Sequence, residues 1–272
     1  GYKVFENLSV GMNFSYLYGN ITHSVATVFN NSNAFSSLRT DKIKVSDYKL
    51  DLGVQYTQDF GEKHKVNLGA VYSYGHDLHS TGYKYKETFS SQTSSIQTQT
   101  VDSIQNAFSL PHTFGVGATF PSGYRATQLA NPNLKWEAAT QYNVGLDYTL
   151  QKWADIKFFN QQGAFNDRKK ISFGAEFVPN PTRRGYLNRI KYRIGAYYSD
   201  PYAKVNGNEG AREYGASFGF GFPIFRNKSI LNISGQYIKV SPKFKGMLEE
   251  NYLKVNIGLT FNERWFMKWR VE

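Results

Sequence analysis

The stretch YLKVNIGLTFNERWF, residues 252–266, alternates apolar and polar residues without a break from Leu253 to Phe261. In a β-strand, successive side chains point to opposite sides, so this stretch predicts a strand with one apolar face and one polar face. In a soluble sandwich the apolar face would pack on a core, whereas in a membrane barrel it would contact lipid. The rest of the chain must decide between these two environments.

The composition excludes a helical membrane protein. The chain has 272 residues, of which 40% are hydrophobic, and its mean hydropathy is −0.50. No apolar run approaches the roughly 20 residues that a membrane helix needs. The 17% of aromatic residues and the 24 glycines favour strands with close backbone approaches, and the absence of cysteine excludes disulfides and thiolate metal sites. The first residues lack a secretion signal and immediately precede a strand, which fits an N-terminally truncated chain.

The same alternation recurs along the whole chain and predicts about ten strands. The segments before the opening stretch are 8–16, 48–56, 66–74, 114–120, 142–148, 171–177, 190–198, 214–222 and 231–237. Their apolar faces carry residues such as Leu52 and Leu146, which we expect to point into lipid. Their other faces carry glycines and polar residues, unlike a sandwich core, and we expect five of these to line a lumen: Asp51, Gln55, Asp147, Glu176 and Asn256.

The lengths of the connections favour a membrane barrel over a soluble sandwich. Long connections at Gly19–Lys44 and His76–Leu110 alternate with tight turns, and such sorting is typical of outer-membrane barrels. The insert SSQTSSIQTQTVDSIQNAFSL, residues 90–110, is interpreted as a structureless surface loop. The gap from Pro121 to Ala139 is an exception, because it should be tight and is long. We therefore predict an all-β fold, a transmembrane antiparallel outer-membrane β-barrel that occupies residues 1–272 as one domain.

The charges and the last aromatic residues indicate the surroundings of such a barrel. Trp265 and Trp269 follow the last strand together with Lys268 and Arg270, as in an interfacial belt. The net charge of +11 fits anionic lipid head groups or lipopolysaccharide phosphates. No nucleic-acid-binding fingerprint is present. The expected partners are the lipid bilayer and lipopolysaccharide of the outer membrane of a Gram-negative bacterium.

Four segments carry a family resemblance: KVSDYKLDLGVQYTQDFGEKHKVNLGAVYSY, PHTFGVGATF, YNVGLDYTLQKWADIKF and NYLKVNIGLTFNERWF. Together they resemble the C-terminal part of FadL-type outer-membrane transport proteins. The resemblance implies a monomeric barrel of fourteen strands with an N-terminal hatch, of which the last ten strands are visible here. It also implies passive uptake of long-chain fatty acids or other hydrophobic compounds. No residue of the hatch site has a counterpart in this chain.

A second resemblance points to an alternative function. LANPNLKWEAATQYNVGLDY, residues 129–148, is similar to a segment of SusC-like TonB-dependent receptors, which implies the C-terminal part of an energised nutrient receptor. A structural barrel subunit that binds other envelope proteins is a third possibility.

An outer-membrane protease or phospholipase is a fourth possibility, because His76, Asp77 and His79 lie where a strand would leave the membrane, and a histidine–aspartate dyad could activate water or orient a nucleophile. No partner dyad is placed opposite them, and no serine follows in a readable motif. We therefore expect no enzymatic activity, no cofactor and no metal site.

The candidate ligand site lies in the two long connections, which carry more apolar residues than a solvated loop needs. If these loops form a groove, a hydrophobic small molecule would first bind to Phe29, Phe35, Leu38, Ile96, Ile104, Phe108 and Leu110. Alternatively, these residues pack the loops onto each other and close the mouth of the barrel.

Overall fold

The computed structural model describes residues 1–29, 34–60, 64–90, 96–122, 140–159, 161–181, 185–205, 207–224, 229–244 and 246–261. The strands are β1 (Tyr2–Phe5), β2 (Leu8–Thr27), β3 (Phe35–Phe60), β4 (His64–Ser73), β5 (Ser80–Ser90), β6 (Ile96–Gln105), β7 (Thr113–Ser122), β8 (Gln141–Gln151), β9 (Arg168–Val178), β10 (Lys191–Ser199), β11 (Lys204–Val205), β12 (Asn208–Glu209), β13 (Ala211–Ile224), β14 (Ser229–Pro242) and β15 (Glu250–Phe261). One short 3-10 helix, η1, spans Tyr186–Arg189. No helix in the described ranges is long and apolar enough to cross a membrane.

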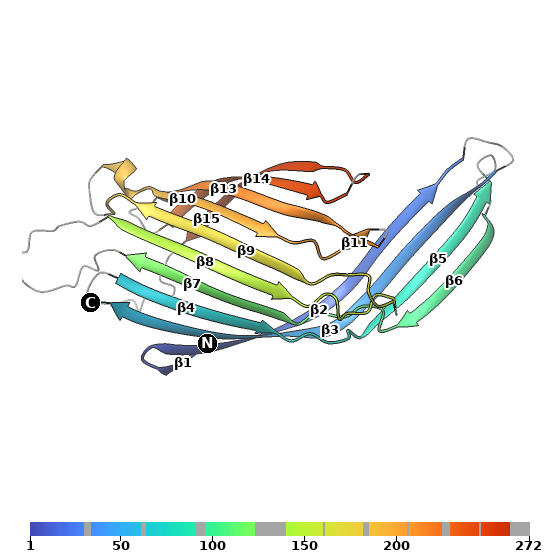
Figure 1. Cartoon of the computed structure of the whole chain (residues 1–272), viewed down its shortest axis with the longest axis horizontal. Coiled ribbons are helices and arrows are strands. Elements are labelled where there is room, and N and C mark those ends of the chain that lie inside the picture. Colours follow the sequence, from blue (N-terminus) through green and yellow to red (C-terminus); the bar gives the residue numbers. More distant parts are fainter. Residues whose placement is uncertain are drawn as a thin grey trace, which may run out of the picture.

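Thirteen strands form one antiparallel sheet, which confirms the predicted all-β fold (Figure 1). The strand order of its main path is β1-β2-β3-β4-β7-β8-β9-β10-β13-β14-β15, and β5 and β6 branch from β3. Apart from the short β1, each strand of the main path coincides, to within one residue at the ends of β4 and β10, with or includes one of the ten alternating segments of the sequence. We call these ten strands, without the arm described below, the wall. The wall does not close in the described residues, because β2 and β15 lie at its two ends without pairing with each other.

The two long connections are not loops, and this corrects the sequence-based expectation. Within Gly19–Lys44, β2 and β3 continue as one ladder and turn only after Thr27, which pairs with Ser37. Within His76–Leu110, β5 pairs with the outer part of β3, and β6 pairs with β5. The insert at residues 90–110 therefore contributes strand β6 rather than a structureless loop. The outer parts of β2 and β3, together with β5 and β6, form a sheet that projects beyond the wall, and we call this sheet the arm (Figure 1).

Few apolar side chains are buried, because most of them lie on one exposed face of the wall. The main buried cluster contains Ile43, Ala107 and Phe159, and it lies at the base of the arm. Phe159 comes from the connection between β8 and β9, so the cluster joins the arm to the wall.

Several expectations concern residues outside the described ranges. They include the cationic aromatic group at Trp265 and Trp269, and most of the 129–148 segment that is similar to SusC-like receptors.

Candidate functional site

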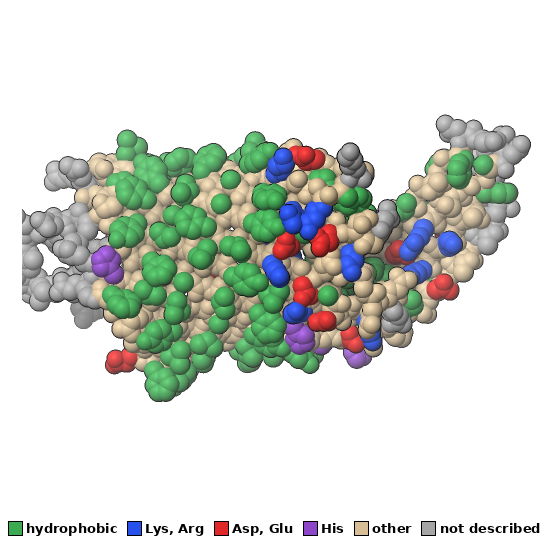
Figure 2. All heavy atoms as spheres, viewed as in Figure 1, with side chains coloured by type: hydrophobic (Ala, Val, Ile, Leu, Met, Phe, Trp, Pro, Cys, Tyr) green, Lys and Arg blue, Asp and Glu red, His purple; other side chains and the backbone are tan. Residues whose placement is uncertain are grey.

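The outer face of the wall is apolar from one end to the other. The cross-strand register places Val10, Val54, Ala70, Val116 and Tyr148 in one row on the same side. Leu52 and Leu146 lie on this side and are 42% and 53% exposed. Figure 2 shows hydrophobic side chains spread over the visible face of the wall, with charged side chains gathered towards the arm. The predicted separation of apolar from polar residues onto two faces is confirmed. The face opposite the apolar one carries Asp51, Gln55, Asp147, Glu176 and Asn256.

Aromatic side chains border this apolar face on two levels. One row is Tyr142, Phe177, Tyr192 and Phe220, on neighbouring strands β8, β9, β10 and β13. Six residues along the same strands, a second row contains Tyr148, Ile171, Tyr198 and Tyr214. Aliphatic residues such as Leu146 and Ile194 lie between the rows. Aromatic girdles around an apolar band are the pattern of a membrane-spanning barrel.

The inner face of the wall is hollow and lined largely by glycine and polar residues. An open hollow of about 620 Å³ runs along β2, β3, β4, β7 and β8. Its lining includes Gly11, Gly53, Gly69, Gly115, Gly117 and Asp147. Asp147 lies across Gly117, where a Cβ atom would come within 2.1 Å of its Oδ1. The glycines thus let polar side chains lie flat against the wall and leave the hollow open.

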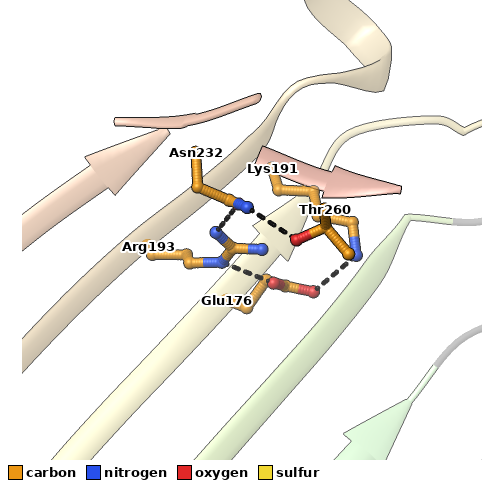
Figure 3. A network of polar contacts seen from close by, with 5 residues as sticks. All are labelled: Glu176, Lys191, Arg193, Asn232 and Thr260. Carbon is orange, nitrogen blue, oxygen red and sulfur yellow. Dashed lines mark hydrogen bonds and ion pairs between the residues drawn. The ribbon is translucent and has the colours of Figure 1, made fainter. Parts of the chain in front are cut away.

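A polar network occupies the inner face at the other side of the wall (Figure 3). Arg193 on β10 donates from Nε to Glu176 Oε2 at 2.7 Å and from Nη1 to Asn232 Oδ1 at 2.7 Å. Lys191 Nζ lies 3.5 Å from Glu176 Oε1, and Asn232 Nδ2 donates to Thr260 Oγ1 at 3.2 Å. The Arg193 side chain crosses over β13 to reach Asn232 on β14. It can do so because β13 has Gly221, which has no side chain, at the crossing point. The network connects four strands, β9, β10, β14 and β15, across the inner face.

The base of the arm is an apolar junction. Phe159 is 4% exposed, and its backbone N–H donates to the Ala107 carbonyl at 2.8 Å. Gly82 on β5 faces this ring so closely that a Cβ atom would come within 2.6 Å of Phe159 Cε1. Trp153 lies beside the junction, with its ring 6.4 Å from Phe108 and 5.0 Å from Tyr202. At this position the tryptophan packs among aromatic neighbours.

The predicted ligand residues separate into two groups along the arm. Phe29 and Phe35 lie near its tip and are 48% and 58% exposed. Leu38, also in the outer part of the arm, is half-buried. Ile104 and Phe108 pack against the buried cluster at the base. Leu110 is half-buried and its N–H donates to the His76 carbonyl, while Ile96 pairs with Phe89 in the backbone register. The structure thus does not bring the seven residues together in one place.

The histidine and aspartate residues near β4 do not form the dyad considered from the sequence. Asp77 accepts a hydrogen bond from Ser109 Oγ at 2.5 Å. His76 lies instead between the rings of Tyr48 and Tyr74, and its Nε2 is 3.5 Å from Asp47 Oδ1. No group of three potential metal ligands was found in the described ranges.

The ionic network of Arg193 and Glu176 was not predicted as a unit. Glu176 was expected on the inner face, but its partners come from strands that are distant in sequence. The register of β9 with β10 brings them together, and alternation within a single strand does not reveal that register.

Three comparisons relate the chain to known proteins. A family model described as BamG matches residues 1–272. Among solved structures, a CymD monoaromatic hydrocarbon channel is similar with a TM-score of 0.63 and 13% sequence identity, and the match covers 97% of this chain and 71% of that chain. No curated protein matches significantly. The matching family differs from the FadL-type family inferred from the sequence, and no comparison supports the SusC-like resemblance.

Proposed function

The chain belongs to the BamG family, and on this premise we propose that it is an outer-membrane β-barrel protein through which small hydrophobic molecules diffuse passively. The proposal depends chiefly on one observation. The wall has a continuous apolar face on its outer side and a polar face with an open hollow on its inner side. The fold is similar to that of a CymD monoaromatic hydrocarbon channel. The surroundings would be the bilayer and lipopolysaccharide of a Gram-negative outer membrane.

Uptake of a radiolabelled monoaromatic hydrocarbon by intact cells tests this function. Lipopolysaccharide slows the entry of such compounds, so cells that produce the protein should take up the probe faster than cells that lack it. Uptake should persist after the proton gradient of the inner membrane is dissipated, because passive diffusion needs no energised partner. Equal uptake with and without the protein would contradict a channel, and strict dependence on the gradient would favour a TonB-dependent receptor.

For the first contact with a ligand, we propose the exposed tip of the arm. Phe29 and Phe35 present apolar area there, whereas Phe108 packs at the base. Replacing Phe29 and Phe35 by serine should weaken binding of a fatty-acid-like probe by about 1 kcal/mol per site. Phe108→Ser is the matched control, and it should loosen the arm without a direct effect on capture. Unchanged probe binding in the tip variants would show that the two rings do not contact ligand.

A second candidate function is that of a structural barrel subunit in a larger envelope complex. It is favoured by the arm, because β2 and β3 have 20 and 26 residues, about twice the 9–11 residues that cross a membrane. A variant in which β2 and β3 are joined by a tight turn and β5–β6 is deleted should still fold as a stable barrel in the membrane, although it lacks the proposed capture tip. If the arm serves a complex, the same variant should lose stable co-purification of other envelope proteins.

We further propose that the protein is not an enzyme. The hydrogen bond from Ser109 engages Asp77, and His76 stacks on tyrosines rather than meeting this carboxylate. Hydrolase assays with phospholipid and peptide substrates should therefore give the same rates for the wild-type protein and for His76→Ala.

A further inference from the structure

The outer edge of the arm is formed by β6, which pairs with β5 on one side only within the described part of the chain. Figure 1 shows β6 at the outer side of the arm, away from the wall. Residues 99–103 are exposed, and Val101 is 50% exposed. The free side of β6 therefore presents backbone N–H and C=O groups with none of the described strands beside them.

The sequence of β6 has little of what usually protects such an edge. Natural edge strands are blunted by charged side chains, especially lysine, and by proline, bulges or short length, and the one charged residue of β6 is Asp102. The strand IQTQTVDSIQ has 10 residues, no lysine and no proline, and its one register irregularity lies at the Thr88–Phe89 end of the pairing. Threonine, valine and isoleucine make it a good strand former. This edge is suited to accept a further strand.

A row of charges that crosses the arm ends at this edge. His23, Asp41, Lys84 and Asp102 are directly opposite one another on β2, β3, β5 and β6. Asp41 forms an ion pair with Arg39, and Lys84 Nζ lies 4.6 Å from the centre of the Phe159 ring. Asp102 forms no ion pair with any described residue. A strand added beside β6 would place one residue directly opposite this free carboxylate.

We propose that β6 binds an extended segment of another protein by strand addition, with a lysine or arginine of that segment facing Asp102. Strand addition takes affinity from main-chain hydrogen bonds and specificity from alternate side chains. Opposite charges at directly paired positions are favourable, and like charges are unfavourable. Pairing of two β6 strands from two copies of the chain fits less well, because β6 has no basic residue to face the aspartate. This inference goes beyond solute passage and does not depend on it.

Two labelled peptides test the proposal on the full-length protein in detergent. Both alternate threonine and valine over twelve residues, and they differ only in a central lysine or glutamate. The lysine peptide should bind about fivefold more tightly than the glutamate peptide, as measured by fluorescence anisotropy. The preference should reverse in Asp102→Lys and shrink in Asp102→Asn. Hydrogen exchange should slow in residues 96–105 when the peptide binds.

Two proline variants then test whether the main chain is the contact. N–H groups of consecutive strand residues point to opposite edges, so only one of Thr100→Pro and Val101→Pro removes an outward N–H. The variant that removes an outward N–H should lose peptide binding while β5 keeps its protection from hydrogen exchange. The variant that removes an N–H directed at β5 should disturb the β5–β6 pairing. Equal binding of the two peptides, a preference unchanged in Asp102→Lys, or binding without protection of β6 would each overturn the proposal. Hydrocarbon uptake should be the same in Asp102→Lys as in the wild type, so failure of this inference is distinct from failure of the channel.

Discussion

Leu52 offers the sharpest test of the membrane orientation of the wall. It lies on β3, with its side chain on the apolar outer face, opposite Met12 on one neighbouring strand and Tyr72 on the other. Tyr48 and Tyr56 lie four residues away on either side of it and point the same way. At about 3.4 Å per residue and a tilt of about 45°, each tyrosine is roughly 10 Å from Leu52 along the membrane normal. This position corresponds to the middle of an apolar band about 25 Å tall.

Leu52→Arg should therefore lower the free energy of unfolding by about 2–4 kcal/mol, the cost of arginine at the midplane of a barrel. Gln55→Arg is the matched control, because Gln55 lies on the same strand but on the inner face, opposite Ser9 and Gly69. Its cost should stay below about 1 kcal/mol. Guanidinium titration of the protein in phospholipid vesicles, followed by tryptophan fluorescence, measures both values. Equal costs for the two variants would refute the assignment of the apolar face to lipid.

Three further predictions concern packing and charge. Phe159→Ala should destabilise the arm by about 3–5 kcal/mol, seen as faster hydrogen exchange in β5, because this ring fills the junction at its base. Gly215→Ala should be destabilising because a Cβ atom would come within 1.9 Å of the Tyr197 ring. The loss of stability should be smaller in a Tyr197→Ala background, and a double-mutant cycle should give an interaction energy of about 0.5–3 kcal/mol. Burial alone would raise the pKa of Asp167, but hydrogen bonds from Lys152 and the Ala154 N–H lower it below its ordinary value. The stability from this ion pair should be present above the unfolded pKa and be lost as the pH falls through the lowered value, whereas Asp167→Asn should show no such loss in pH-dependent unfolding.

The wall could be predicted from the sequence because each of its strands has two different environments. Leu253 to Phe261 must present one side to lipid and the other to the inner face, so the alternation is strict. The arm lacks this constraint, and both of its faces are largely polar. In β6, threonine and glutamine occur with no apolar face, and in the outer part of β3, lysine and isoleucine alternate over only a few residues. Such segments show strand propensity without periodicity, and for this reason the sequence alone predicts loops there.

For the inner-face network and the ligand residues, the sequence predicts on which face of its own strand a residue lies, but not which residues of other strands it contacts. Glu176 could be assigned to the inner face from its neighbours along β9. Its contact with Arg193 depends on the register between two strands, and the arginine reaches Asn232 only because Gly221 clears the path. The separation of Phe35 from Phe108 has the same origin, since the ladder of β2 and β3 places one at the tip and leaves the other at the base.

The unbroken ladder between β2 and β3 also has a mechanical consequence. Its register runs without a shift from Leu8, opposite Tyr56, to Thr27, opposite Ser37. Both strands run from the tip into the wall, so a force applied at the tip along the strand direction is carried by two continuous backbones and does not pull the strands past each other. Because β2 and β3 belong to both the arm and the wall, a displacement of the tip is transmitted directly to the wall.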